Sequence, residues 1–313
     1  MRIVFFGTPE FAVPTLQRLL SSSEYEVVGV VTQPDAKRGR GNQTTPSRVK
    51  AIAHAHNPNI PIWSPDRLKK DADILTALAN SHADVFVVVA YGQILSQAIL
   101  DMPKYGCINV HGSLLPKYRG AAPIQWAIAN GEKILGITTM QMDAGIDTGD
   151  MLLKASLEVT PEDQAESLSQ KLADLGANLL IETLQNLDQI TPISQDHSQF
   201  TYASTIPKEL WHLDWTKSAI ALHNQIRGFY PNCYTTYQEQ RLKITATEVS
   251  TRIYDNSCSA GTVYLIEKNI GFTVATGDGL LLIKEIQPAG KRSQSGWDFA
   301  NNKWGDKTGE ILI

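Results

Sequence analysis

Short apolar runs alternate with amphipathic segments through the first half of the chain. Strands are expected at the runs rich in Val, Ile and Phe, which are residues 3–6, 27–32, 60–63 and 85–90. Helices are expected in the segments between them, at residues 9–20, 47–56 and 71–80. The run at 85–90 is apolar throughout, as in strands that a parallel sheet buries on both faces. This alternation predicts a doubly wound, Rossmann-like α/β domain.

The pattern changes in the second half of the chain. A helix (123–130), a strand (136–142) and a long helix (161–187) complete the first domain, which we place at residues 1–189. A polar stretch without periodicity indicates a linker at 190–208. Five short β-type runs with glycine turns then predict a small OB-like β-barrel at 209–313. The alternative is a generic β domain that only buttresses the first.

Composition and charge narrow the class of protein. The chain has 313 residues, of which 42% are hydrophobic and 19% charged, as in soluble globular proteins. Apolar runs stay far below the ~20 residues of a membrane span, and the amino terminus lacks a signal-peptide pattern, so we expect a cytoplasmic protein. Cys107, Cys233 and Cys258 are too few and too scattered for a disulfide framework or a zinc site. A net charge of -4 argues against indiscriminate nucleic-acid binding but allows a local basic patch.

The segment that begins at Asn109 carries the most chemical information. Asn109 and His111 are two residues apart on a predicted strand, so their side chains point to the same side. Ligands of open α/β sheets bind beyond the carboxyl ends of the strands, where this pair would lie. The apolar residues after Ser113 would form a wall beside it. The alternative is an ordinary strand-to-loop turn with two hydrogen-bonded side chains.

A second polar segment can supply a carboxylate to this pair. Asp147 follows His111 by 147 − 111 = 36 residues, one helix and one strand later, which allows it to return beside the same strand end. Transfer of a one-carbon acyl group to an amine forms a negatively charged oxygen, which Asn109 and a protonated His111 can stabilise. Asp147 can orient the imidazole and help to take the proton of the amine. Taken alone, an aspartate in such a loop is more often a turn former.

These motifs resemble those of formyltransferases that use 10-formyltetrahydrofolate. The resemblance lies in Asn109 to His111, in Ser113 to Pro116 and in Asp147, and it extends through the predicted second domain. The opening segment 5–12 and the block 118–125 resemble more closely the members that act on initiator methionyl-tRNA. The resemblance implies that Asn109, His111 and Asp147 are catalytic and that Ser113, Leu114, Leu115 and Pro116 border the folate pocket. It also implies 10-formyltetrahydrofolate as the formyl donor, without a metal.

The basic segment at 33–50 is the candidate for binding the acceptor tRNA. It contains a glycine-rich loop and the start of the next helix, and its cations could contact a phosphate backbone. Family members usually have Pro where Arg48 stands and commonly Arg where Trp126 stands. The alternative is a solvated surface loop. The complete set of predicted tRNA-binding residues is Lys37, Arg38, Arg40, Arg48, Lys50, Lys243, Lys291 and Arg292.

Other acceptors and other classes of protein remain open at this point. The same chemistry could formylate an amino sugar nucleotide or glycinamide ribonucleotide, or release formate with water as the acceptor. Gly7 to Glu10 does not supply the glycine-rich phosphate loop of the ribonucleotide enzymes. A non-catalytic RNA-binding protein is a further alternative, which the complete Asn-His-Asp set argues against. We expect a monomer with folate and tRNA as partners and no association with membranes.

Overall fold

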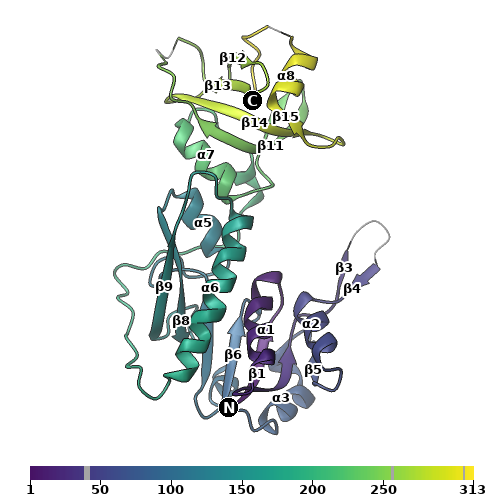
Figure 1. The fold of residues 1–313 in the computed structure, drawn as a ribbon, viewed down its shortest axis with the longest axis vertical. Helices are drawn as coiled ribbons and strands as arrows, with labels where there is room; N and C mark the ends of the chain where they lie inside the picture. The colour runs from purple at the N-terminus through teal and green to yellow at the C-terminus, as the bar shows by residue number, and fades with distance from the viewer. Residues whose placement is uncertain (39–42, 255–256, 306) are drawn as a thin grey trace. The chain divides into compact units, whose positions relative to one another are not determined.

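The computed structural model describes residues 1–38, 43–254, 257–305 and 307–313 (Figure 1). The chain divides into two compact units. The first comprises Met1–Gly120, Ile134–Leu157 and Ser169–Ala203. The second comprises Ala121–Lys133, Glu158–Leu168 and Ser204–Ile313. Each unit therefore collects segments that are distant in the sequence.

A seven-stranded sheet forms the centre of the first unit, in the order β5-β2-β1-β6-β7-β8-β9. Its strands are β1 (Arg2–Gly7), β2 (Glu26–Val31), β5 (Ile62–Trp63), β6 (Val85–Val89), β7 (Cys107–His111), β8 (Ile134–Gln141) and β9 (Met151–Glu158). The pairs from β5 to β7 are parallel, and β7 pairs with β8 in antiparallel orientation. Strand β9 has no counterpart in the sequence prediction.

Helices and a small hairpin complete this part of the chain. The helices are η1 (Glu10–Ala12), α1 (Val13–Ser21), α2 (Arg48–His56), η2 (Leu68–Lys70), α3 (Ala72–Ala79), α4 (Gln97–Leu100) and α6 (Ala165–Gln185). The basic segment, expected to be a loop, contains strands β3 (Ala36–Arg38) and β4 (Gln43–Thr45), which pair in antiparallel orientation.

The central strands are buried on both faces, which explains their uninterrupted apolar sequence. Val4 and Phe6 of β1 pack with Leu78 of α3 in one core cluster. Ile3 and Phe5 alternate with them and are also fully buried, so they face the other side of the sheet. Cover on both faces is the arrangement of a doubly wound sheet. The predicted Rossmann-like α/β fold is therefore confirmed.

The second unit contains an antiparallel sheet in the order β10-β11-β14-β13-β12, with β15 paired to β14. Its elements are α5 (Pro123–Ala129), η3 (Lys208–Trp211), α7 (Ala219–Gly228), β10 (Tyr234–Tyr237), β11 (Gln240–Val249), β12 (Val263–Glu267), β13 (Gly271–Ala275), β14 (Leu280–Pro288), β15 (Gln294–Ser295) and α8 (Gly296–Lys303). Trp304 contacts Phe272 and Phe299 edge-on in the core, with ring centroids 5.1 and 5.2 Å apart. The five predicted β runs are confirmed as an antiparallel sheet domain.

Helix α7 buries a histidine that makes the stability of the second unit depend on pH. His223 Nε2 lies 3.2 Å from the Pro161 carbonyl oxygen, and Nδ1 lies 2.9 Å from the Thr247 hydroxyl. A carbonyl only accepts, so the neutral ring donates through Nε2 and accepts at Nδ1. Burial, and next the charge of Arg227, lower the pKa of His223 to about 4.

We expect this histidine to destabilise the folded chain in mild acid. Below pH 6.5 the His223 side chain binds a proton in the unfolded chain but stays neutral in the folded chain. The free energy of unfolding therefore falls as the pH drops from 6.5 to about 4. The contribution lost by pH 5 is about 2 kcal/mol. Urea unfolding of His223→Gln should therefore change less between pH 7 and pH 5 than that of the parent. The exposed His56→Gln variant should keep the parental dependence, and an equal loss in both variants would exclude His223 as the cause.

Candidate active site

The two polar residues of the predicted site lie at the carboxyl end of β7. Asn109 pairs with Val88 of β6 on one side and with Met140 of β8 on the other, and these pairs fix the register of β7 in the sheet. The His111 side chain is only 6% exposed. Its Nε2 atom lies 2.9 Å from the carbonyl oxygen of Tyr118. The loop after β7 thus holds the imidazole ring from one side.

The Asp147 carboxylate reaches this strand end, as the sequence spacing allowed. Its Oδ1 atom accepts a hydrogen bond from Asn109 Nδ2 at 3.3 Å, and its Oδ2 atom lies 3.6 Å from His111 Nδ1. The backbone N–H of Gly120 donates to Oδ2 at 2.8 Å. Asp147 has a φ of +52°, which is uncommon outside glycine. The surrounding contacts therefore hold a carboxylate against an amide and an imidazole in a conformation that the isolated residue disfavours.

The hydrogen-bonding partners of His111 define which ring atoms carry protons. The Tyr118 carbonyl only accepts, so Nε2 donates to it. Nδ1 faces the Asp147 carboxylate, which also only accepts when it is ionised. Nδ1 and the carboxylate oxygen are 3.6 Å apart, which is longer than a hydrogen bond, so an Nδ1–H is left for a bound substrate. A positively charged donor beside the amide of Asn109 suits a developing negative oxygen.

Two buried side chains, Gln195 and Arg119, hold the loop that carries Asp147. The Gln195 amide donates to the carbonyl oxygens of Asp147 and Gly149 at 2.9 and 2.7 Å. Its carbonyl oxygen accepts from Nε and from one terminal nitrogen of Arg119, at 3.0 and 2.7 Å. Both side chains are almost fully buried. Sequence reasoning missed this contact, because Gln195 lies in the polar segment interpreted as a linker and no spacing connects it to Asp147.

We expect Gln195 to act as a positioning residue for Asp147. Gln195→Leu removes the donor to two loop carbonyls and the acceptor of a buried guanidinium, so kcat should fall by roughly 10- to 100-fold. Gln195→Glu keeps the acceptor for Arg119 but loses the donors, and its kcat should be intermediate. KM should change little in both variants. Gln199→Leu, in the same segment but exposed, is the matched control; an equal kcat loss in Gln199→Leu would contradict this role.

The residues predicted to border a folate pocket form a fixed turn after β7. The Ser113 hydroxyl donates to the Lys117 carbonyl at 2.6 Å, and the Leu115 N–H donates to the Thr138 hydroxyl at 3.1 Å. Leu115 packs inward against a small apolar cluster. Leu114 and Pro116 are only half-buried, so they keep apolar surface that an aromatic ligand can contact. Ser113 and Leu115 shape the turn instead.

The cysteine on the same strand is unsuited to covalent catalysis. Cys107 is completely buried at the start of β7. Burial raises the pKa of its thiol to about 12, so the nucleophilic thiolate is scarce at neutral pH. Among the residues that the structure describes, no group of His, Cys, Asp or Glu side chains is arranged to hold a metal ion.

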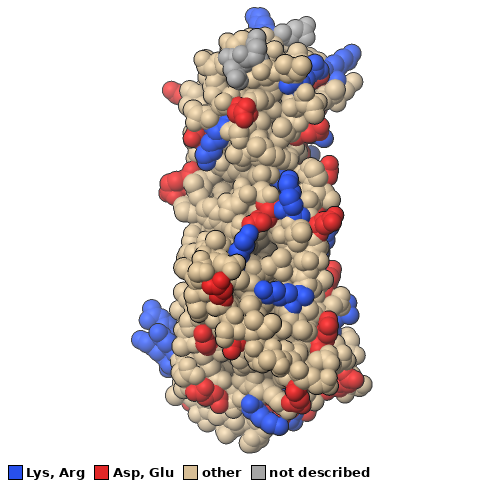
Figure 2. Space-filling view, turned by 90° about the vertical axis from the view of Figure 1, so that its left-hand side faces the viewer, with Lys and Arg blue, Asp and Glu red and all other residues tan. Residues whose placement is uncertain are grey.

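The cations predicted to bind tRNA occur in several places. Arg48 forms a 2.7 Å ion pair with Glu10, and Lys50 a 2.8 Å ion pair with Asp35. Lys37 and Arg38 belong to β3, whereas Arg40 lies outside the described residues. In the second unit, Lys243 is half-buried on β11, and Lys291 and Arg292 are exposed between β14 and β15. Figure 2 shows basic and acidic side chains interspersed over most of one face.

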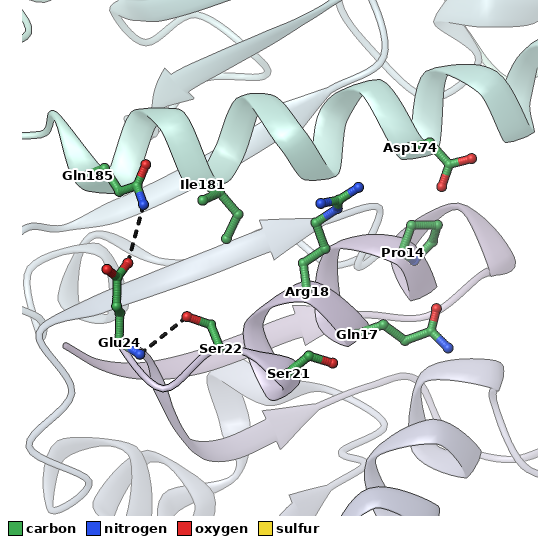
Figure 3. Close-up of a pocket in the computed structure, with 9 residues that line it drawn as sticks. All are labelled: Pro14, Gln17, Arg18, Ser21, Ser22, Glu24, Asp174, Ile181 and Gln185. Atoms are coloured by element: carbon green, nitrogen blue, oxygen red, sulfur yellow. Dashed lines mark hydrogen bonds between the residues drawn. The ribbon is translucent and has the colours of Figure 1, made fainter.

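A surface groove in the first unit has a different character from the Asp147 site. It lies between α1 and α6, has a volume of about 470 Å³, and is lined mainly by polar side chains (Figure 3). Gln185 donates to Glu24 across it at 3.2 Å. None of the predicted site residues that the structure describes lines this groove. It is an open, polar depression where two helices meet, and we assign it no catalytic role.

Two family models match most of the chain. The sequence model of the formyl transferase family matches residues 1–184, and that of the formyl transferase C-terminal domain matches residues 205–303. The chain therefore falls in the class of formyl transferases. Methionyl-tRNA formyltransferase of Trichormus variabilis is 56% identical, and that of Nostoc sp. is 52% identical, each over 96% of both chains. The chain belongs to the methionyl-tRNA formyltransferase family.

Solved structures share the fold at low sequence identity. WlaRD, a sugar 3N-formyl transferase, has a TM-score of 0.66 and 21% identity, over 93% of this chain and 99% of its own. HypX from Aquifex aeolicus, solved with tetrahydrofolic acid, has a TM-score of 0.63 and 15% identity over 96% of this chain. This chain spans 47% of the HypX chain. In the described part of the chain, no helix is long and apolar enough to cross a membrane.

Proposed function

We propose that this chain transfers the formyl group of 10-formyltetrahydrofolate to the α-amine of methionine on initiator tRNA, in the cytoplasm and as a monomer. The observation that carries the proposal is the convergence of three polar groups. One carboxylate lies 3.3 Å from the Asn109 amide nitrogen and 3.6 Å from His111 Nδ1. The high identity to methionyl-tRNA formyltransferases over nearly the whole chain supports this acceptor.

Asp147 has one role in the reaction, and Asn109 and His111 share another. The amine attacks only when it is neutral, and the Asp147 carboxylate is the group that accepts its proton. Asn109 and protonated His111 donate hydrogen bonds to the formyl oxygen as it gains negative charge. The second N–H of the Asn109 amide is available for this oxygen, and so is His111 Nδ1, which lies 3.6 Å from Asp147 and is thus beyond hydrogen-bond distance. The reaction then requires no covalent intermediate on the protein.

Other residues would bind the two substrates. We assign residues 1–189 to catalysis and 209–313 to tRNA binding; residues 190–208, expected to be a linker, also supply Gln195 to the loop of Asp147. Leu114 and Pro116 offer apolar surface to the folate, and Ser113 and Leu115 hold the turn that presents it. Lys37, Arg38, Arg40, Arg48 and Lys50 would contact the acceptor stem. The cations of the second unit would contact phosphates elsewhere on the tRNA.

Comparison of two methionine-charged tRNAs tests this function. Initiator and elongator tRNA carry the same amino acid, so a difference in formylation depends on the tRNA alone. We expect the initiator to be formylated with the higher kcat/KM when label is followed from the folate into acid-released N-formylmethionine. Equal formylation of both tRNAs would contradict initiator selectivity, and formylation of neither would contradict the proposed acceptor.

A further inference from the structure

Two large aromatic side chains are exposed beside the Asp147 site. Phe200 is 50% exposed and Tyr202 is 58% exposed. They are two residues apart, and Tyr202 pairs with Arg119 as an isolated parallel β-bridge. Neighbouring exposed aromatic rings are characteristic of surfaces that bind a partner or a ligand. The nature of that ligand follows from where the segment is attached.

Backbone hydrogen bonds attach the aromatic segment to the loop that contacts Asp147. The Arg119 N–H donates to the Thr201 carbonyl at 2.9 Å, and the Ala203 N–H donates to the Arg119 carbonyl at 2.7 Å. The next residue along is Gly120, whose N–H donates to the Asp147 carboxylate. The aromatic segment is therefore bonded to the residue next to Gly120, which itself donates to the proposed proton acceptor.

Each ring also has a rigid support. The Arg119 guanidinium lies 5.2 Å from the centre of the Phe200 ring, and the same guanidinium is held by Gln195. Tyr202 packs on Gly120, where an added Cβ would lie 3.2 Å from the ring and 2.8 Å from the Ala203 carbonyl oxygen. Gly120 also has a φ of +115°, which favours glycine. The rings are thus held in place and remain open to solvent.

We propose that Tyr202, with Phe200 beside it, is the stacking surface for the terminal adenine of the acceptor tRNA. The inference rests on the proposed function, because it needs an aminoacyl ester at Asp147. Only the ester and one ribose separate the reacting amine from the terminal base, so the base must lie close to the carboxylate. Aromatic side chains stack on bases with a sequence-tolerant gain in affinity. The stack would hold the amine within reach of Asp147.

Two Tyr202 variants and two tRNAs test this contact. Tyr202→Leu removes the ring but keeps an apolar side chain, and Tyr202→Phe keeps the ring. On methionyl-initiator tRNA, kcat/KM should fall by about tenfold or more in Tyr202→Leu and stay near the parental value in Tyr202→Phe. On a chemically charged tRNA whose terminal nucleotide lacks its base, Tyr202→Leu and the parent should react alike.

The outcomes separate this contact from the proposed function. If the parent enzyme does not formylate charged initiator tRNA, the proposed function fails and this inference fails with it. If the parent is active but Tyr202→Leu loses nothing, only the stacking surface is refuted. An equal loss on the tRNA with and without the terminal base also refutes it, since the ring would then support the fold or the methionine side chain.

Discussion

Replacing His111 with alanine is expected to lower kcat by about 10²- to 10⁴-fold while KM for folate and tRNA changes little. The ring is held between the Tyr118 carbonyl and the Asp147 carboxylate, and it supplies the charged donor for the formyl oxygen. Its loss therefore acts on the transition state and leaves most substrate contacts in place. Single-turnover formylation at saturating tRNA measures the chemical step.

Two further variants make this result interpretable. His111 is almost fully buried, so alanine creates a cavity, and His111→Gln serves as a second variant with a side chain closer in volume. The exposed His54→Ala variant is the matched control and should behave like the parent. Near-parental turnover in both folded His111 variants would show that the imidazole is not part of the catalytic set.

The second large effect is expected on tRNA affinity, when cations of the basic segment are replaced. Replacing Lys37, Arg38 and Arg40 together with glutamine is expected to raise KM for tRNA at least tenfold, roughly, and to leave KM for folate unchanged. If all three cations contact phosphates, the slope of log affinity against log salt concentration should become shallower by about 3. Filter binding of initiator tRNA between low and physiological salt measures both quantities.

A control that removes positive charge elsewhere in the first unit isolates the position of these cations. Lys69 and Lys70 are exposed at the end of η2. Their replacement by glutamine removes two charges from the same unit without changing the basic segment. We expect a parental salt slope in this control. An equally shallow slope in both variants would mean that net charge, and not the segment, determines tRNA affinity.

The central strands of the seven-stranded sheet could be predicted because the apolar pattern that indicates each one lies within the strand itself. Val85–Val89 is apolar at every position, and only a strand buried on both faces suits such a run. The five β runs after residue 232 were predictable for another local reason: their composition favours strands, and turn residues bound them. Strand β9 was missed because only its first two positions are buried and the others alternate between half-buried and exposed. The β3–β4 hairpin was missed because its composition is polar.

The site was only partly predictable for a related reason. Asn109 and His111 share a strand, so their alternation alone predicts that they lie on one side. Asp147 required the chain to return over one helix and one strand, which the βαβ pattern allowed. Gln195 and the Gly120 N–H depend on tertiary contacts that leave no periodic signal. Sequence patterns thus reach the groups on regular elements and miss those that position them.

The most direct measurement compares acceptors. The purified chain would be incubated with 10-formyltetrahydrofolate and with methionyl-initiator tRNA, an amino sugar nucleotide, or water alone, while tetrahydrofolate release and formylation of the acceptor are both followed. We predict rapid release only with the charged tRNA, with one formyl group on the methionine amine for each tetrahydrofolate released. Release in water alone, or formylation of the sugar nucleotide in preference to the tRNA, would contradict the proposed function.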